Sequence, residues 1–348
     1  MVDKTPSITV AQTYTPDSPK WRRLRSPSTY LFTNTGFEFK EIDMHTCVMA
    51  RIDTTNDQFT VDNGSLLSIL GNVDARTVAT GTYDPGANRW FLDLSPGLPR
   101  YSPVLLAPLA VFDRTFIKYF SLLGSGYSLN DSYPNGTQLF SDNWLKTDFN
   151  QEGLVVNQDA LFTGFVANNQ GFIIKNDNRR EVWQINNSQV YAKRKPFIGG
   201  FYGKFLTTTA EINKVDYGFV ISESKDLALK TKEFYQYDTK SDTWTRKADF
   251  PGDDRTKGVF FGINDKIYYG LGQSKTQPKG FRDIWQYDTR TNLWSKFATY
   301  PGGGNIDVTT AMVAGKVYIG LGYYVDATTI NTSKYIGAND FWEFVPNR

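Results

Sequence analysis

The sequence predicts an all-β protein, and two observations lead to this fold class. The first is a repeat: residues 234–252 (FYQYDTKSDTWTRKADFPG) and residues 283–302 (DIWQYDTRTNLWSKFATYPG) carry the same landmarks, with Tyr237 and Tyr287 lying 50 residues apart. The second is that short aromatic and β-branched runs, such as GVFFGI and KIYYGLG, alternate with turn residues inside one repeat, as strands do. A unit of this length cannot bury its own apolar face and stacks on its copies. Four strands per unit, repeated around an axis, predict a β-propeller.

Weaker copies of the unit earlier in the chain predict a ring of six four-stranded blades. Inner strand pairs are expected within residues 104–126, 160–177 and 204–224. Residues 142–148 (DNWLKTD) are expected to form a third strand, because they resemble DIWQYD. The strands of residues 24–81 cannot be placed from the pattern, so seven blades are the alternative. The fourth strands of the six blades are expected at Trp21, Trp90, Phe149, Tyr191, Trp244 and Trp294.

The two ends of the chain predict how the ring closes. Residues 339–345 (NDFWEFV) match the third strand of a unit, and no fourth strand follows them. Residues 20–28 (KWRRLRSPS) resemble the Trp-bearing fourth strand. We therefore expect one blade to combine N-terminal and C-terminal strands. Residues 1–19 are polar and rich in Thr, Pro and Ser, which predicts a tail or linker before a propeller that spans residues 20–348.

The composition and charge of the chain argue against nucleic-acid binding and a transmembrane segment. The net charge of the 348 residues is +2, so the basic excess of a nucleic-acid-binding protein is missing. No apolar run is long enough to predict a transmembrane segment. We predict an exported protein, periplasmic or on the cell surface, whose targeting segment is absent from this chain, with a cytoplasmic protein as the alternative. The sequence predicts no oligomeric state.

In its landmarks the chain resembles the kelch repeat: an aromatic strand ending in Tyr-Asp, a short turn, a Trp, a Pro turn and an Ile-Tyr strand ending in glycine. One departure is a Leu inside the expected Gly-Gly doublet, in residues 270–272 and 320–322. The ending Asn-Asp-Phe-Trp at residues 339–342 is similar to kelch proteins exported by Bacteroidetes-type bacteria. The matching residues are Trp285, Tyr287, Asp288, Asn292, Trp294 and Pro301 in one unit, and Tyr237, Asp238, Trp244, Pro251 and Arg255 in the other.

Metal and nucleophile chemistry finds little support in the sequence. Kelch propellers resemble galactose oxidase, whose copper site needs two His, two Tyr and a cross-linked Cys, but this chain has one histidine, His45, and one cysteine, Cys47. These two residues would share a strand face, yet a zinc site needs at least three protein ligands, so ordinary packing is favoured. Residues 53–65 are rich in oxygen ligands but lack the spacing of a calcium loop. We predict no catalytic residue, no metal and no cofactor.

Three residues are candidates for ligand binding. Arg255 and Arg100 each follow a Pro turn, and the matching place in the next repeat holds Asn305. In kelch domains this position points toward the mouth of the central channel, and an arginine there suits a carboxylate ligand. The alternative is an arginine that hydrogen-bonds a neighbouring blade. Two long variable segments, residues 125–143 and 323–340, could overhang the same face or be simple surface loops.

These features predict a non-catalytic binding or scaffold protein that uses loops at one channel mouth, with a glycan or a protein as its ligand. The alternative comes from the resemblance, because six-bladed kelch proteins include sialic acid mutarotases, a class of epimerase. Such an enzyme needs an acid–base pair and an arginine for the carboxylate. The sequence does not show that pair, so the binding role is the first prediction.

Overall fold

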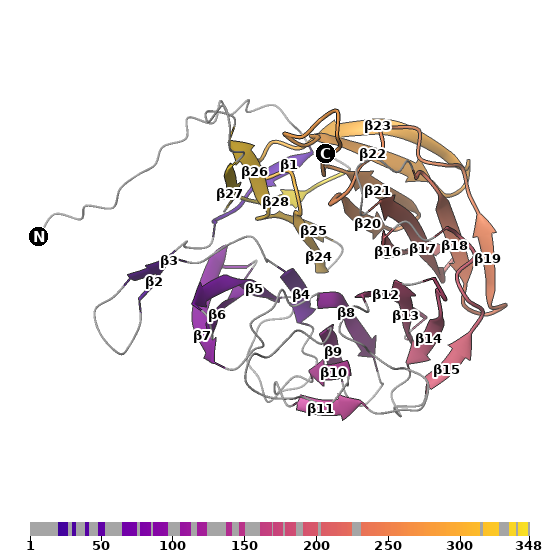
Figure 1. Cartoon of the computed structure of the whole chain (residues 1–348), viewed down its shortest axis with the longest axis horizontal. Coiled ribbons are helices and arrows are strands. Elements are labelled where there is room, and N and C mark those ends of the chain that lie inside the picture. The colour runs from indigo at the N-terminus through magenta and orange to yellow at the C-terminus, as the bar shows by residue number, and fades with distance from the viewer. Residues whose placement is uncertain are drawn as a thin grey trace, which may run out of the picture.

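The protein is an all-β propeller, with strands arranged around a common centre (Figure 1). The structure is a computed structural model, and it describes residues 20–26, 30–32, 39–41, 48–52, 65–74, 77–84, 86–96, 105–112, 117–123, 137–140, 146–149, 161–168, 170–176, 178–185, 191–200, 203–224, 231–313, 316–326, 334–338 and 340–346. Among these residues, no helix is long and apolar enough to cross a membrane.

Four blades are described with many of their side chains, and each is a four-stranded antiparallel sheet. Each blade is given below from its innermost strand, which lies nearest the centre of the propeller, to its outermost strand at the rim (Figure 1). The β12–β15 blade consists of β12 (Leu161–Ala167), β13 (Gln170–Asn176), β14 (Val182–Ile185) and β15 (Tyr191–Arg194). The β16–β19 blade consists of β16 (Gly203–Ile212), β17 (Val215–Ser224), β18 (Phe234–Asp238) and β19 (Thr243–Arg246). The β20–β23 blade consists of β20 (Val259–Ile263), β21 (Lys266–Gly270), β22 (Asp283–Asp288) and β23 (Leu293–Thr299). The terminal blade consists of β24 (Thr309–Val313), β25 (Lys316–Gly320), β28 (Phe341–Phe344) and β1 (Trp21–Arg23).

Two further four-stranded sheets occupy the arc between the terminal blade and the β12–β15 blade (Figure 1). One contains β4 (Val48–Ile52), β5 (Ser65–Asp74), β6 (Thr77–Asp84) and β7 (Arg89–Pro96). The other contains β8 (Leu105–Phe112), β9 (Ile117–Leu123), β10 (Thr137–Phe140) and β11 (Lys146–Phe149). Two separate hairpins are formed by β2 (Tyr30–Phe32) with β3 (Phe39–Glu41) and by β26 (Tyr323–Asp326) with β27 (Lys334–Gly337).

The strand predictions are confirmed for most of the chain and wrong in one segment. The inner pairs expected within residues 104–126, 160–177 and 204–224 are present. The expected third strand at residues 142–148 is wrong, because the third strand of that sheet is β10, which pairs with β9 on one side and β11 on the other. Residues 146–149 form the fourth strand instead, so the resemblance of DNWLKTD to DIWQYD was misleading.

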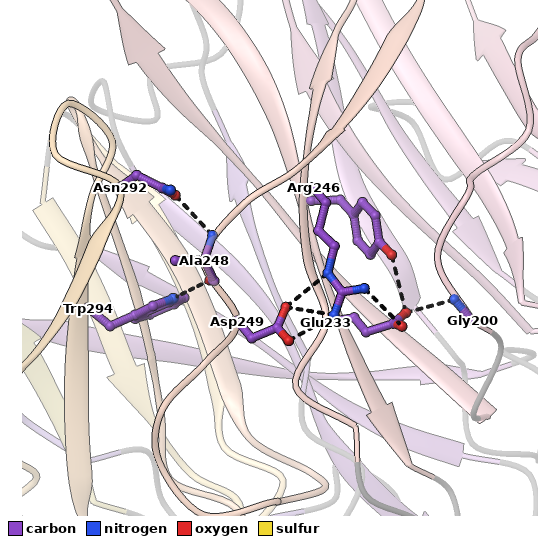
Figure 2. A network of polar contacts seen from close by, with 8 residues as sticks. Gly200, Glu233, Arg246, Ala248, Asp249, Asn292 and Trp294 are labelled. Atoms are coloured by element: carbon purple, nitrogen blue, oxygen red, sulfur yellow. Dashed lines mark hydrogen bonds and ion pairs between the residues drawn. The ribbon is translucent and has the colours of Figure 1, made fainter.

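A repeated hydrogen-bonding unit, which we call the tyrosine staple, joins neighbouring blades. In the β20–β23 blade, Tyr287 donates its hydroxyl to Asn292 Oδ1 at 2.8 Å, and the same oxygen accepts the backbone N–H of Ala248 from the preceding blade at 2.9 Å. Trp294 Nε1 donates to the carbonyl of Ala248 at 2.9 Å (Figure 2). Asn292 has φ of 57°, a left-handed conformation that Asn tolerates better than most residues.

The staple recurs at two more blade junctions. Tyr237 donates to Asp242 Oδ1, which also accepts the N–H of Lys195. Burial and the hydrogen bond to Asp242 raise the pKa of Tyr237 well above its usual value, so the hydroxyl remains a donor. The third copy is formed by Tyr83, Asn88 and the N–H of Arg25.

The third staple lies where the two ends of the chain meet. β1 pairs with β28, with Trp21 opposite Phe344, so the predicted sharing of one blade by N-terminal and C-terminal strands is confirmed. The Trp21 ring lies 5.3 Å from Tyr300 and 4.8 Å from Phe344. Tyr83 of β6 packs edge-on against Phe341 of β28. The terminal blade is therefore bound both within itself and to the β4–β7 sheet.

The Leu inside each expected glycine doublet has a structural explanation. Leu271 and Leu321 have φ of 55° and 63°, a backbone conformation that costs a non-glycine residue roughly 1–2 kcal/mol. Both side chains are fully buried, and burying a Leu stabilises a fold by about 1.5–3 kcal/mol. The gain from burial therefore matches or exceeds the backbone cost, which is why Leu is tolerated in this left-handed conformation.

Replacing Asn292 with Gly tests the tyrosine staple. Gly keeps the left-handed backbone but removes the shared acceptor, so we expect the free energy of unfolding to fall by about 1–3 kcal/mol in denaturant titrations. The matched control is Asn213→Gly, because Asn213 is exposed, has φ of 53° and forms no side-chain hydrogen bond among the described residues. Equal effects of the two changes would show that the staple contributes nothing beyond turn conformation.

Candidate functional site

Two of the three candidate binding residues, Arg255 and Asn305, lie at one end of the propeller. Antiparallel strands alternate in direction, so the connections between second and third strands and between successive blades emerge at the same end, which we call the loop face. Around the β20–β23 blade the loop face consists of residues 247–258, 271–282 and 300–308. The opposite end carries tight turns such as Asn264-Asp265. Arg100 lies outside the described residues, as do His45, Cys47 and residues 53–64.

Arg255 is held by its own blade. Its side chain is 0% exposed, and it donates to both carboxylate oxygens of Asp283, at 2.8 and 3.2 Å, and to the carbonyl of Leu271 at 3.3 Å. The guanidinium lies 4.3 Å from the ring centre of Phe281 and 5.0 Å from that of Phe250. These contacts give Arg255 a role in holding the loop face together, whereas its role in ligand binding stays a prediction.

Asp283 begins the third strand and is the partner that balances Arg255. Burial raises the pKa of this carboxyl, but hydrogen bonds from Arg255 and the positive charge of its guanidinium outweigh burial and hold the pKa below its usual range. Trp285 Nε1 adds a hydrogen bond to the same carboxylate at 2.7 Å. Asp283 is therefore held as an anion by fixed partners.

In the next repeat the carboxylate at the matching place has hydrogen-bond donors other than an arginine. Asp340 occupies the place of Asp283, and its carboxylate accepts hydrogen bonds from Tyr300 at 2.7 Å, Trp342 at 2.9 Å and the N–H of Gly304 at 3.2 Å. Tyr300 stands where the preceding repeat has Phe250, so a hydroxyl replaces the missing guanidinium. Burial dominates and raises the pKa of Asp340 despite these donors.

Asn305, the third candidate, lies at the junction between these two repeats. Its carbonyl accepts the N–H of Gly272 at 2.7 Å, and its Nδ2 donates to the carbonyl of Lys279 at 3.2 Å. Arg255 binds the carbonyl of Leu271, the neighbour of Gly272, so Arg255 and Asn305 support the same left-handed turn from two sides. A Cβ on Gly272 would collide with the backbone of Thr256 and Gly258, which requires glycine there.

Glu223, a residue that the sequence did not single out, connects the β16–β19 blade to the β20–β23 blade. Its buried carboxylate accepts the N–H groups of Lys257 and Gly258, at 3.0 and 2.9 Å, and the hydroxyl of Tyr269 at 3.0 Å. Burial and the charge of Glu223 raise the pKa of Tyr269 well above its usual value. This carboxylate fixes the start of β20 and thereby the position of the Lys257 side chain.

The Lys257 cluster, formed by Lys257, Asp307 and Tyr323, is a half-exposed polar group on the loop face. Lys257 Nζ donates to the Tyr323 hydroxyl, lies 5.0 Å from the centre of that ring and lies 4.0 Å from Asp307 Oδ2. The side chains of Lys257 and Asp307 are 41% and 40% exposed. Their φ values of 59° and 54° are unusual for these residues, and such strain tends to be retained at functional sites.

A repeat comparison could have found part of this cluster. Lys257 and Asp307 stand 50 residues apart, at matching places just before β20 and β24, and they carry opposite charges. Tyr323 could not have been found in this way, because it reaches the cluster through a bridge with Ile306 that belongs to the tertiary fold. Within the described ranges, no three His, Cys, Asp or Glu side chains group as metal ligands would.

Comparisons with known proteins support the architecture. No family model matches the chain, and no curated protein matches it. Among solved structures, that of YjhT aligns with a TM-score of 0.53 and 12% sequence identity, covering 84% of this chain and 97% of the YjhT chain. At this identity the likeness shows the fold, a β-propeller with four-stranded blades. The resemblance to the kelch family stays a prediction.

Removing the Arg255 guanidinium is expected to destabilise the protein strongly. Arg255→Ala leaves Asp283 partly buried without its cation, and breaking a buried pair in this way costs about 3–5 kcal/mol. Arg290→Ala is the matched control, because Arg290 pairs with Asp265 but its side chain is 73% exposed, and an exposed pair contributes about 0–1 kcal/mol. Thermal unfolding of both variants measures the difference, and similar midpoints would contradict the structural role of Arg255.

Asp283 and Asp340 are expected to make the stability of the protein depend on pH in opposite directions. The lowered pKa of Asp283 means that its contribution to stability is present above the unfolded-state pKa and is lost as the pH falls through the folded-state pKa. The raised pKa of Asp340 means that its contribution is present below the unfolded-state pKa and is lost as the pH rises through the folded-state pKa.

We therefore compare wild type with Asp283→Asn and with Asp340→Asn between about pH 7 and pH 2. On acidification, the unfolding free energy of wild type should fall relative to Asp283→Asn and rise relative to Asp340→Asn. Parallel slopes for the two variants would contradict the assignment.

Proposed function

We propose that this protein is a non-catalytic binding protein, and that it takes a glycan at the loop face through the Lys257 cluster. The observation that carries the proposal is the half-exposed Lys257–Asp307–Tyr323 group, held on a strained backbone where two inner strands begin. In this proposal the domain is a six-bladed kelch-type propeller and the protein is exported to the periplasm or the cell surface.

The arrangement of the sheets supports six blades. The described residues form six sheets of four strands each. Their innermost strands neighbour one another in the order β24, β4, β8, β12, β16, β20, and β20 lies beside β24 again. Each innermost strand thus has another innermost strand on both sides, as expected of a closed ring.

The chemistry of the Lys257 cluster suits an uncharged or weakly charged polar ligand. Lys257 supplies N–H donors, Asp307 supplies carboxylate acceptors, and the opposite charges balance. Sugar hydroxyls both donate and accept, so they can satisfy such a pair in a way that a plain anion cannot. Arg255 and Asn305 enter the proposal as residues that position the loop face, and Arg100 stays a predicted contact to an acidic group.

Three carboxylates near the loop face support a binding role over catalysis. Glu223, Asp283 and Asp340 each accept at least three hydrogen bonds from the protein itself. A general base needs an acceptor directed at its substrate. These three groups are instead directed at backbone, tyrosine, tryptophan and arginine donors of the fold.

An acid–base enzyme, such as a mutarotase-like epimerase, is the second candidate, and one observation favours it. The hydrogen bond between Lys257 Nζ and the Tyr323 hydroxyl is a contact through which a proton could be exchanged with a sugar hydroxyl. The same cluster would then act on the ligand that it binds, so one experiment must separate binding from turnover.

Proton NMR with a panel of sialic acids and neutral oligosaccharides makes this separation. We expect the ligand signals to broaden with wild type and binding to weaken about tenfold in Lys257→Ala, because a charged hydrogen-bond donor is lost. Lys240→Ala is the control, since Lys240 is exposed in a turn at the opposite end. Accelerated exchange between anomers, abolished in Lys257→Ala, would replace the binding role with the enzymatic one. No broadening with any sugar would contradict the glycan and favour a protein ligand.

A further inference from the structure

We propose a second binding site on the loop face, at the junction of the β12–β15 and β16–β19 blades, where Ser222, Thr231 and Glu233 form a polar cluster for an uncharged hydroxylated ligand such as a sugar or polyol. We call it the Ser222 cluster. It shares no residue with the Lys257 cluster and does not depend on the function proposed above.

Comparison of the blades shows that Ser222 replaces a buried Leu. Ser222 donates its N–H to the carbonyl of Glu233, the residue before β18. In the next two blades the residues making this same bond are Leu271, to Asp283, and Leu321, to Asp340. Both leucines are fully buried, and Leu271 belongs to an apolar core cluster. At this hydrogen-bonding position the β16–β19 blade therefore has a short hydroxyl side chain on an extended strand, whereas its neighbours have a large apolar one on a left-handed turn.

Thr231 is a second replacement of the same kind. It precedes Glu233 by two residues, as Phe281 precedes Asp283 and Ala338 precedes Asp340. The Phe281 ring covers the Arg255 guanidinium at 4.3 Å. In the β16–β19 blade, Thr stands in place of that ring, so two neighbouring positions have changed together from apolar to hydroxyl side chains.

The two hydroxyls are buried but unpaired in the part of the chain that the structure describes. Ser222 is 2% exposed and Thr231 is 8% exposed, and neither Oγ of Ser222 nor Oγ1 of Thr231 has a hydrogen-bond partner. Buried polar atoms are normally satisfied, and leaving them unsatisfied is unfavourable. Continuing the β17–β18 pairing places both side chains on the sheet face that carries the Glu233 side chain.

Glu233 determines the charge of the cluster. Its Oε2 accepts the N–H of Gly200 at 2.8 Å and the hydroxyl of Tyr235 at 3.4 Å, and its Oε1 lies 3.8 Å from Arg246 Nη1 (Figure 2). Arg246 also binds Asp249. Arg246 thus balances one of the two carboxylates, those of Glu233 and Asp249, and Glu233 already accepts hydrogen bonds from the fold. A group that both donates and accepts, such as a hydroxyl, suits two hydroxyls beside a carboxylate.

The cluster reaches the surface at Glu233 and is preorganised. The Glu233 side chain is 19% exposed, so Glu233 is the residue of the cluster that a ligand would meet first. Gly199 lies against the rings of Phe197 and Tyr235, where a Cβ would collide with both. This close approach of the backbone brings the N–H of Gly200 to Glu233 and fixes the carboxylate before any ligand arrives.

The test uses saturation-transfer NMR of the full chain with D-glucose, D-galactose, D-mannose and glycerol. We compare wild type with the double variant Ser222→Ala, Thr231→Val, which removes both hydroxyls and nearly preserves side-chain shape. Thr245→Val is the control, because Thr245 is an exposed hydroxyl residue on β19 of the same blade. Lys257→Ala separates this site from the Lys257 cluster.

At least one probe should bind wild type, Thr245→Val and Lys257→Ala, and the double variant should bind it about tenfold more weakly. Without a ligand, the thermal midpoint of the double variant should equal or exceed that of wild type, since unpaired hydroxyls have been removed. Unchanged binding in the double variant, or no binding of any probe to wild type, would overturn the proposal. A lower midpoint of the double variant without sugar binding would also overturn it, because the hydroxyls would then be satisfied by buried water.

Discussion

The fold depends on one hydrogen-bonded contact, in which a tyrosine hydroxyl and a backbone N–H of the neighbouring blade share a single side-chain oxygen of a left-handed turn residue. A four-stranded blade buries its faces only against other blades, so its stability depends on how firmly neighbours are held. Apolar rings supply the area, but they constrain orientation weakly. The staple adds direction, because Asn292 or Asp242 can accept both donors only when adjacent blades are in register.

Carboxylates at the start of the third strands add a second level of organisation. Glu233, Asp283 and Asp340 occupy matching places, and each is satisfied by a different set of donors: Gly200, Tyr235 and Arg246, then Arg255 and Trp285, then Tyr300, Trp342 and Gly304. The backbone around the carboxylate is repeated, while its donors vary. Sequence variation at the loop face is thus partly compensation within the fold, as when Tyr300 replaces Phe250 in the repeat that lacks an arginine.

Sequence reasoning succeeded where a feature is local and failed where it depends on pairing. Tyr287 and Asn292 are five residues apart, so the repeat that contains the staple was visible in the chain. The third strand of the β8–β11 sheet was missed because β10 carries neither the Tyr-Asp ending nor a Trp, and only its pairing with β9 and β11 defines it. The role of Arg255 could not be predicted from its place after a proline turn, since Asp283 lies 28 residues further along the chain. The Lys257 cluster was missed for a similar reason, because its three residues come from three connections.

The clearest guide to function is a departure from the repeat that brings no compensation within the fold. The repeat that lacks an arginine at the place of Arg255 has the Tyr300 hydroxyl as a replacement donor. The β16–β19 blade has Ser222 and Thr231 at the places of Leu271 and Phe281. Among the described residues, no hydrogen bond compensates for this second change. A substitution that removes apolar contacts and adds unpaired hydroxyls weakens the fold twice. We therefore attribute its presence to the ligand proposed for the Ser222 cluster. The same reasoning applies to Lys257 and Asp307, whose strained backbone holds two opposite charges at the surface although neither charge is needed to bury the core. Both departures lie on the loop face, which is where a ligand would reach them.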